Sequence, residues 1–190
     1  MRSASLNAAL FGLGFAALAL IARETYNPYI KPVLQEAGLF EVKPINGKYH
    51  FAGHPKIVDG DTIKLNGKSL RFAKIDTCEN TQLAQTAIGE IDCGRWATEG
   101  LRTVIDGEKI TCESNRLDRF KRYIVECIQT NIGDIGTSML RRGFAFPYDE
   151  KRLPKTAKIA LNNARQEGRG IWDFVSVEQP REWRKKHRRK

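Results

Sequence analysis

The sequence predicts an α+β fold with a mostly β core, and three observations support this prediction. Five short runs are rich in strand-forming residues, and five strands are enough for a small closed barrel. Three helical stretches are interspersed in the order three strands, helix, two strands, two helices. Of the 190 residues, 41% are hydrophobic and 28% are charged, as in an ordinary globular chain.

Turn-forming residues separate the predicted strands. Asn66-Gly67, between the second and third runs, is a strong signal for a hairpin turn. The strands are expected at about residues 49–58, 62–65, 69–75, 109–114 and 123–129.

The predicted helices are recognised by their periodicity and by their stop signals. Apolar side chains recur at helical spacing in the first and third helices, and the small apolar residues of the third helix indicate core packing. The helices are expected at residues 95–105, 135–142 and 154–167, followed by Gly107, Gly143 and Gly168.

The N-terminus differs from the rest of the chain. Residues 6–22 are apolar except for Asn7, and charged residues flank them. This stretch is long for the core of a signal peptide and slightly short for a bilayer span. We therefore expect residues 1–24 to be a signal peptide or an N-terminal membrane anchor. Either one would place the following domain outside the cytoplasm, in the periplasm, secreted or membrane-anchored. The alternative is a buried core helix.

The remaining chain divides by composition. Residues 25–46 contain three prolines without sustained periodicity and are expected to be a linker before a domain at 47–175. Residues 176–190 are expected to be a basic tail, since Arg181 to Lys190 contribute +6 of the formal net charge of +10. Such a tail attracts polyanions such as nucleic acid or anionic lipid. The alternative is a solvated end without a specific role.

The four cysteines favour an oxidising compartment. None forms a C-x-x-C pair, and the three histidines are scattered, which argues against a zinc site. Cys112 and Cys127 flank a turn-like stretch near residue 119 or 120, so an antiparallel hairpin would place them opposite each other. We expect a disulfide between them and, by elimination, a second between Cys78 and Cys93. The alternative is four buried thiols.

Acidic residues cluster around the third predicted strand of an otherwise basic chain. Asp61 opens the second strand, whereas Asp76 and Glu79 close the third. Pairing through the Asn66-Gly67 turn would place Asp61 opposite Phe72, with Asp76 just beyond. Carboxylates gathered at one end of a sheet repel each other unless a cation offsets the repulsion. An all-oxygen set of this kind suits calcium or magnesium.

Two arginines complete a set of groups suited to phosphodiester hydrolysis. Arg71 lies on the strand that ends in Asp76, and Arg122 ends the loop 118–122. A guanidinium presents planar donors that match phosphate oxygens. A metal ion would polarise the phosphate, and the arginines would offset the charge that develops on it. A free carboxylate would take the proton from the attacking water.

An ordered set of motifs resembles the thermonuclease (staphylococcal nuclease-like) family, of the exported bacterial type. Residues 57–65 read IVDGDTIKL and residues 70–79 read LRFAKIDTCE. They are similar to V-x-D-G-D-T-h-x-h and R-h-x-x-h-D-x-P-E, in which h is apolar. Residues 118–122 resemble the family's D-x-Y-G-R loop, and residues 168–172 resemble its closing G-h-W. The resemblance covers about residues 50–175.

The resemblance implies a five-stranded OB-type Greek-key barrel capped by three helices. It also implies a calcium-dependent nuclease that cleaves DNA and RNA with little sequence preference and leaves 3′-phosphate ends. By motif position, the Ca²⁺ ligands would be the side chains of Asp61 and Asp76 and the backbone carbonyl of Thr77. Glu79 would be the general base, and Arg71 and Arg122 would hold and stabilise the phosphate.

The resemblance extends to nucleic-acid contacts, although the chain departs from the family pattern at two positions. Tyr148 falls near a nucleotide-contacting tyrosine of the family, and Arg119 and Lys121 are expected to contact nucleic acid from their loop. Cys78 replaces the usual proline, which removes a fixed φ angle. Lys121 replaces the glycine before Arg122, so the loop needs a backbone conformation that a side chain tolerates.

The competing interpretation is a non-catalytic OB-type module that binds nucleic acid and is tethered at the membrane. A pure binder has no use for three clustered carboxylates, because they repel phosphate. On either interpretation the expected partner is DNA, RNA or both. Membrane attachment would follow if residues 1–24 are retained, and no protein partner is implied.

Overall fold

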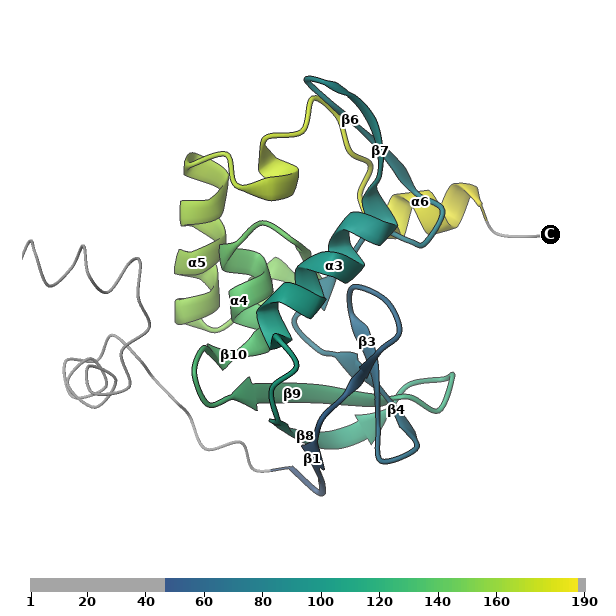
Figure 1. The fold of residues 1–190 in the computed structure, drawn as a ribbon, viewed down its shortest axis with the longest axis vertical. Coiled ribbons are helices and arrows are strands. Elements are labelled where there is room, and N and C mark those ends of the chain that lie inside the picture. The colour runs from purple at the N-terminus through teal and green to yellow at the C-terminus, as the bar shows by residue number, and fades with distance from the viewer. Residues whose placement is uncertain (1–46, 188–190) are drawn as a thin grey trace, which may run out of the picture. The chain divides into compact units, whose positions relative to one another are not determined.

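The computed structural model describes residues 47–187, which form a curled β-sheet with helices packed against it (Figure 1). The strand order of the main sheet is β1-β8-β9-β4-β3-β2, and β10 pairs with β9. This arrangement confirms the predicted mixed α+β fold with a barrel-like β core. The strands of the main sheet are β1 (Tyr49–Gly53), β2 (Lys56–Ile57), β3 (Thr62–Leu65), β4 (Lys68–Phe72), β8 (Ile110–Leu117), β9 (Tyr123–Gln129) and β10 (Gly133–Asp134).

The curl of the sheet follows from how its first two strands are joined. The expected strand at 49–58 is broken at His54 and Pro55, because proline has no N–H for a sheet ladder. β1 and β2 nevertheless lie at opposite ends of the strand order. Two strands joined by so short a link can sit at opposite ends only if the sheet bends back on itself, as a barrel requires.

Both hairpins have the register that the sequence predicts. Thr62 pairs with Arg71 across the first turn, where Asn66 and Gly67 have φ angles of 53° and 73°. Positive φ at both central residues is the conformation of a type I′ hairpin turn. Across the longer turn between β8 and β9, Cys112 pairs directly with its expected partner in the ladder.

The two expected cysteine pairs are present in the structure. The sulfur atoms of Cys112 and Cys127 lie 1.99 Å apart and those of Cys78 and Cys93 lie 1.95 Å apart. The first pair joins the centres of β8 and β9 inside the core. The second joins the segment after β5 (Ile75–Asp76) to the start of α3 (Cys93–Ile105).

Three helices lie close to their predicted positions, and Figure 1 shows them gathered on one side of the curled sheet. These are α3, α4 (Ile135–Arg141) and α5 (Lys155–Gln166). α3 begins where the Asp92 carboxylate accepts the N–H of Arg95 at 2.8 Å, which is a helix cap. The main core lies between the sheet and these helices, and its largest members include Ile63, Leu70, Phe72, Leu101, Ile105, Met139 and Leu161.

Several small elements surround the region that holds the predicted site. β5 pairs with β11 (Phe146–Pro147), and two single turns of 3₁₀ helix, η1 (Glu150–Arg152) and η2 (Gly170–Trp172), flank α5. A second apolar cluster adjoins the chain just after β5, and consists of Cys78, Ala84, Cys93, Phe146 and Ile171.

Two elements differ from the sequence prediction. Residues 81–92, for which no strand or helix is predicted above, form the hairpin β6 (Leu83–Thr86) and β7 (Gly89–Asp92). The expected basic tail contains a fourth helix, α6 (Pro180–Lys186), so the three-helix cap needs correction. Neither element shows the apolar periodicity of a buried strand or helix, because β6 buries only Ala84 and α6 buries only Pro180. Gln85 and Ser176 exchange backbone hydrogen bonds of 2.9 and 3.2 Å, which joins the C-terminal segment to the hairpin.

The predicted signal peptide or anchor at 1–24 and the linker at 25–46 lie outside the described residues. Within residues 47–187, no helix is long and apolar enough to cross a bilayer.

Candidate active site

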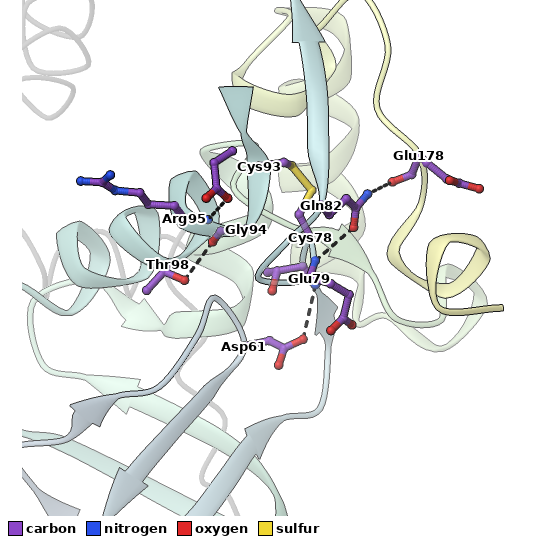
Figure 2. Close-up of a disulfide and its surroundings, with 11 residues drawn as sticks. Asp61, Cys78, Glu79, Gln82, Cys93, Gly94, Arg95, Thr98 and Glu178 are labelled. Carbon is purple, nitrogen blue, oxygen red and sulfur yellow. Dashed lines mark hydrogen bonds between the residues drawn. A yellow bond between two sulfur atoms is a disulfide. The ribbon is translucent and has the colours of Figure 1, made fainter. Parts of the chain in front are cut away.

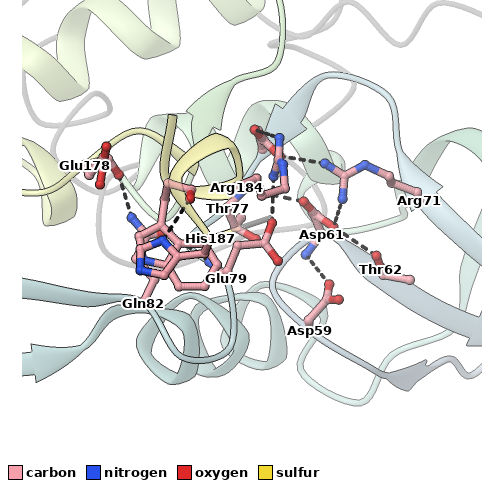
Figure 3. Close-up of polar contacts among 12 residues, drawn as sticks. Asp59, Asp61, Thr62, Arg71, Thr77, Glu79, Gln82, Glu178, Arg184 and His187 are labelled. Carbon is pink, nitrogen blue, oxygen red and sulfur yellow. Dashed lines mark hydrogen bonds and ion pairs between the residues drawn. The ribbon is translucent and has the colours of Figure 1, made fainter. Parts of the chain in front are cut away.

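Asp61, Arg71 and Asp76 form one ion-paired cluster where β3, β4 and β5 come together. Figure 3 shows Arg71 directed toward Asp61. Nη1 of Arg71 donates to Oδ1 of Asp61, and its Nη2 lies 2.6 Å from Oδ1 of Asp76. Both carboxylates are nearly fully buried, at 3% and 5% exposed. The hairpin register causes this meeting, since Arg71 lies opposite Thr62, the neighbour of Asp61.

Local hydrogen bonds fix the Asp61 carboxylate. The Asp61 N–H donates to the side chain of Asp59 at 3.0 Å, which closes the turn that leads into β3. Oδ1 of Asp61 also accepts the Thr62 hydroxyl at 2.9 Å. Its other oxygen accepts the backbone N–H of Thr77 at 3.4 Å. The backbone of Thr77, an expected calcium ligand, therefore lies beside the carboxylate of Asp61.

Glu79 lies on the loop after β5 and is held there through its backbone. The Glu79 N–H donates to Oε1 of Gln82 at 3.0 Å, and Nε2 of Gln82 donates to the carbonyl of Glu178 at 2.6 Å. Gln82 is fully buried, and both the oxygen and the nitrogen of its amide form hydrogen bonds inside the protein, as buried polar groups usually do. The Glu79 carboxylate itself is partly exposed, at 36%. A group in this position is reachable from solvent.

The loop that carries Glu79 packs closely on the first turn of α3 (Figure 2). The Cys78–Cys93 bond ties the two segments together. A Cβ added to Gly94 would lie 2.1 Å from the Glu79 carbonyl oxygen and 2.7 Å from Cα of Asn80. Only glycine permits this approach, so Gly94 helps to determine where Glu79 lies.

We expect Gly94→Ala to lower kcat by about tenfold or more, because a displacement of about 1 Å at a reacting group has effects of that size. The measurement is steady-state cleavage of a labelled oligonucleotide, together with the midpoint of thermal unfolding. Gly100→Ala is the matched control, since it crowds the same helix against the Phe144 ring, away from the loop. Equal kcat for the two variants would contradict a positioning role for Gly94.

Arg184 of α6 enters the cluster, although the sequence analysis assigns it no role. Its Nη1 lies 3.0 Å from Oδ1 of Asp76 and 2.7 Å from Oε1 of Glu79, and its Nη2 lies 2.7 Å from Oδ2 of Asp76. The hydrogen bonds that Arg184 donates to Asp76 raise the pKa of Arg184; its burial opposes this rise, and the hydrogen bond to Glu79 reinforces it. Arg184 is 108 residues from Asp76, so no local motif could have identified it.

Arg122 lies apart from this cluster in the structure. Its Nε and Nη2 lie 2.9 and 2.8 Å from Oδ2 of Asp118, at the other end of the same loop. Burial acts to raise the pKa of Asp118, but the hydrogen bonds donated by the N–H groups of Arg122 and Phe120 lower it by more. Tyr123, which follows Arg122, pairs with Leu70 on the parallel strand β4. By this register Arg122 precedes the residue that pairs with Leu70, so it lies two positions before the level of Arg71 along the sheet, with its guanidinium held by Asp118.

The other residues expected to contact nucleic acid lie on the surface. The Arg119 guanidinium lies 4.7 Å from the Phe120 ring centroid, and the ring of Phe120 is 63% exposed. Lys121 has a φ angle of 61°, so this side chain occupies the left-handed conformation that a glycine would adopt more easily. Tyr148 is exposed, and its N–H donates to the Lys74 carbonyl at 3.0 Å. No described contact joins Tyr148 to the carboxylate cluster.

Burial raises the pKa of Asp61 to about 7. The Arg71 guanidinium opposes this shift, whereas the neighbouring carboxylates of Asp59 and Asp76 add to it. Burial on its own would lower the pKa of Arg71. The carboxylates of Asp61 and Asp76 outweigh this effect, so the pKa of Arg71 is raised. The cluster therefore holds more buried negative charge than Arg71 alone offsets.

The raised pKa of Asp61 predicts how the metal-free protein responds to pH. In the folded state the Asp61 carboxyl keeps its proton up to about pH 7, whereas in the unfolded chain it loses the proton near pH 4. The protonated carboxyl therefore contributes to stability fully at low pH, and this contribution is lost as pH rises through about 7. Between pH 5 and 8 in a chelator, wild type should lose stability relative to Asp61→Asn by at most about 1.4 kcal/mol per pH unit. Denaturant unfolding at each pH measures this difference. Asp173→Asn, at an exposed carboxyl, is the control, and a difference independent of pH would contradict the assignment.

The oxygen-only donor set of the cluster fits a hard divalent cation. Two buried carboxylates offer the oxygen ligands that calcium prefers, and Thr77, whose carbonyl is the third expected ligand, lies next to one of them. Within residues 47–187, no group of three or more His, Cys, Asp or Glu side chains is arranged to hold a metal ion. The expected set contains only two such side chains, so carbonyl, water or substrate oxygens would supply the rest.

Comparison with known proteins connects this geometry to a family. Residues 69–174 match the family described as "Staphylococcal nuclease homologue". An "Uncharacterized endonuclease" of Escherichia coli O157:H7 is 27% identical over 133 residues, which is 68% of this chain and 81% of that protein. The "Succinoglycan biosynthesis protein ExoI" of Rhizobium meliloti (strain 1021) is 26% identical over 122 residues, which is 63% of each chain. The family match begins after Asp61 and ends before Arg184.

Proposed function

Because the chain belongs to the staphylococcal nuclease homologue family, and is therefore a nuclease and a hydrolase, we propose that it is a calcium-dependent phosphodiesterase of low sequence specificity. The observation that carries this proposal is the meeting of Asp61, Asp76, Glu79 and Arg71 at one end of the sheet. The substrate is DNA, RNA or both. The products carry 3′-phosphate ends, by analogy with the family.

Calcium is proposed to bind through the side chains of Asp61 and Asp76 and the carbonyl of Thr77, where it would polarise the phosphate. Arg71 keeps the two carboxylates together, because it pairs with both. With its carboxylate exposed beside this cluster, Glu79 is proposed to accept the proton of the attacking water. Arg71 and Arg122 would stabilise the negative charge that develops on the phosphate oxygens.

Nucleic acid is proposed to lie across the surface loop between β8 and β9. Arg119 and Lys121 would contact phosphates, and the exposed rings of Phe120 and Tyr148 would stack on bases. These contacts are independent of sequence, because every base has an aromatic face and every nucleotide a phosphate. That arrangement agrees with low sequence specificity.

We also propose that residues 1–24 direct export, and that the enzyme acts outside the cytoplasm. Two disulfides within residues 47–187 support an oxidising compartment. Salt washing of membranes tests whether the segment is kept as an anchor. Release by salt alone would contradict a retained hydrophobic anchor, whereas release only by detergent would support one.

Product analysis tests the proposed chemistry. A labelled oligonucleotide is digested with calcium, and the fragments are offered to polynucleotide kinase without phosphatase treatment. Fragments with a 5′-hydroxyl should accept label directly, since the phosphate is left on the 3′ side. Fragments that accept label only after phosphatase treatment would contradict the proposed products.

A further inference from the structure

The C-terminal segment 176–187 is fixed at several points before it reaches the active site. Ser176 pairs with Gln85 in the backbone, and buried Gln82 holds the carbonyl of Glu178. Lys186 lies 2.7 Å from the Glu178 carboxylate, which ties the end of α6 to its start. These contacts orient α6 so that Arg184 points into the carboxylate cluster (Figure 3).

Arg184 occupies positions on Asp76 that a metal ion would use. A carboxylate offers about four acceptor positions. Arg71 occupies one on Asp76 and Arg184 occupies two, so three of them are filled by guanidinium donors. Only one acceptor position on Asp76 then remains for calcium, an ion that takes about six to eight oxygen ligands.

Arg184 also reduces the charge that attracts a cation. Asp61, Asp76 and Glu79, when ionised, carry −3, and Arg71 and Arg184 carry +2, which leaves −1. Without Arg184 the net charge would be −2, which matches a divalent ion. Nη1 of Arg184 also lies 2.7 Å from Oε1 of Glu79, so one oxygen of the proposed base is already engaged. This geometry opposes both calcium binding and proton transfer.

From these contacts we propose that Arg184 is a tethered cation that competes with calcium, so that α6 holds the metal-free enzyme in an inhibited state. The inference rests on the proposed calcium site. Calcium binding displaces the guanidinium from Asp76 and Glu79, and the helix then leaves the cluster. The C-terminal segment thereby sets the calcium concentration at which the nuclease becomes active.

Calorimetric titration of calcium into the full chain without substrate tests this directly. Arg184→Ala should bind calcium on the order of tenfold more tightly than wild type, because the competing charge and its hydrogen bonds are gone. The calcium affinity of Arg184→Lys should lie between those of wild type and Arg184→Ala, since an ammonium cannot form the paired hydrogen bonds that a guanidinium donates to both oxygens of Asp76. Lys185→Ala is the matched control, because it removes the same charge from α6, and within residues 47–187 the ion pair of Lys185 is with Glu182 rather than with the cluster.

Hydrogen exchange on the unmodified protein gives a second readout that needs no variant. Saturating calcium should increase the exchange of the amides of 181–187, and equal exchange with and without calcium would overturn the release of α6. Equal calcium affinities for wild type and Arg184→Ala would overturn the competition while leaving the proposed function intact. No calcium binding by either protein would overturn both. A fall in kcat of Arg184→Ala at unchanged calcium affinity would assign Arg184 to the substrate and contradict the proposal.

Discussion

Glu79→Gln is expected to lower kcat by about two to four orders of magnitude at saturating calcium, with DNA affinity near the wild-type value. The glutamine keeps the size of the side chain but loses the ability to take a proton, the negative charge and the ion pair with Arg184. The loop should keep its position, because Gln82 and the Cys78–Cys93 bond hold it through groups that the substitution leaves unchanged. Single-turnover cleavage, with calorimetry for calcium and anisotropy for DNA, separates chemistry from binding.

Glu178→Gln is the matched control for this variant. It makes the same chemical change near the site, but the Glu178 carboxylate pairs with Lys186 rather than with the cluster. Its kcat should remain within a few-fold of wild type. Wild-type activity in Glu79→Gln would mean that another group takes the proton, and the assigned mechanism would be wrong.

Arg122→Ala is expected to lower kcat by about two to three orders of magnitude, which is typical when a donor to transition-state charge is removed. Its guanidinium is held by Asp118 and is not buried in the carboxylate cluster, so the barrel should stay folded. The result separates Arg122 from Arg71, whose loss would leave two buried carboxylates without their shared partner. The measurement is kcat at saturating substrate, with circular dichroism as a check of folding.

Arg119→Ala serves as the control for Arg122→Ala. Both variants remove one positive charge from the same loop, but Arg119 lies over the Phe120 ring rather than on Asp118. Its effect should appear as weaker, salt-dependent nucleic-acid binding with little change in kcat. Equal losses of kcat in the two variants would indicate that the loop contributes only general charge.

The parts of the site that could be predicted are those that short-range patterns fix. The Asn66-Gly67 turn determines the hairpin register, and the register brings Asp61 and Arg71 together. In the same way, the turn near residue 119 or 120 sets the register of the second hairpin, which places Cys112 opposite Cys127. In these cases a few neighbouring residues decide both the local backbone and which side chains meet.

The parts that could not be predicted depend on contacts between distant segments. α6 is short, highly charged and almost without buried residues, so its sequence predicts a solvated tail. Its position follows from the backbone pairing of Ser176 with Gln85 and from the buried amide of Gln82. The β6–β7 hairpin could not be predicted for a related reason, because its buried Ala84 belongs to a cluster with residues from distant segments, such as Phe146 and Ile171.

Degradation of plasmid DNA and of single-stranded RNA, with calcium and with a calcium chelator, tests the central claim most directly. We predict that the protein degrades nucleic acid with calcium and that the chelator abolishes this activity. Asp76→Asn should be inactive under both conditions, which would link the loss to the proposed metal site. Absence of cleavage by wild type, with DNA still retained in a binding assay, would contradict the account and indicate a non-catalytic nucleic-acid-binding module.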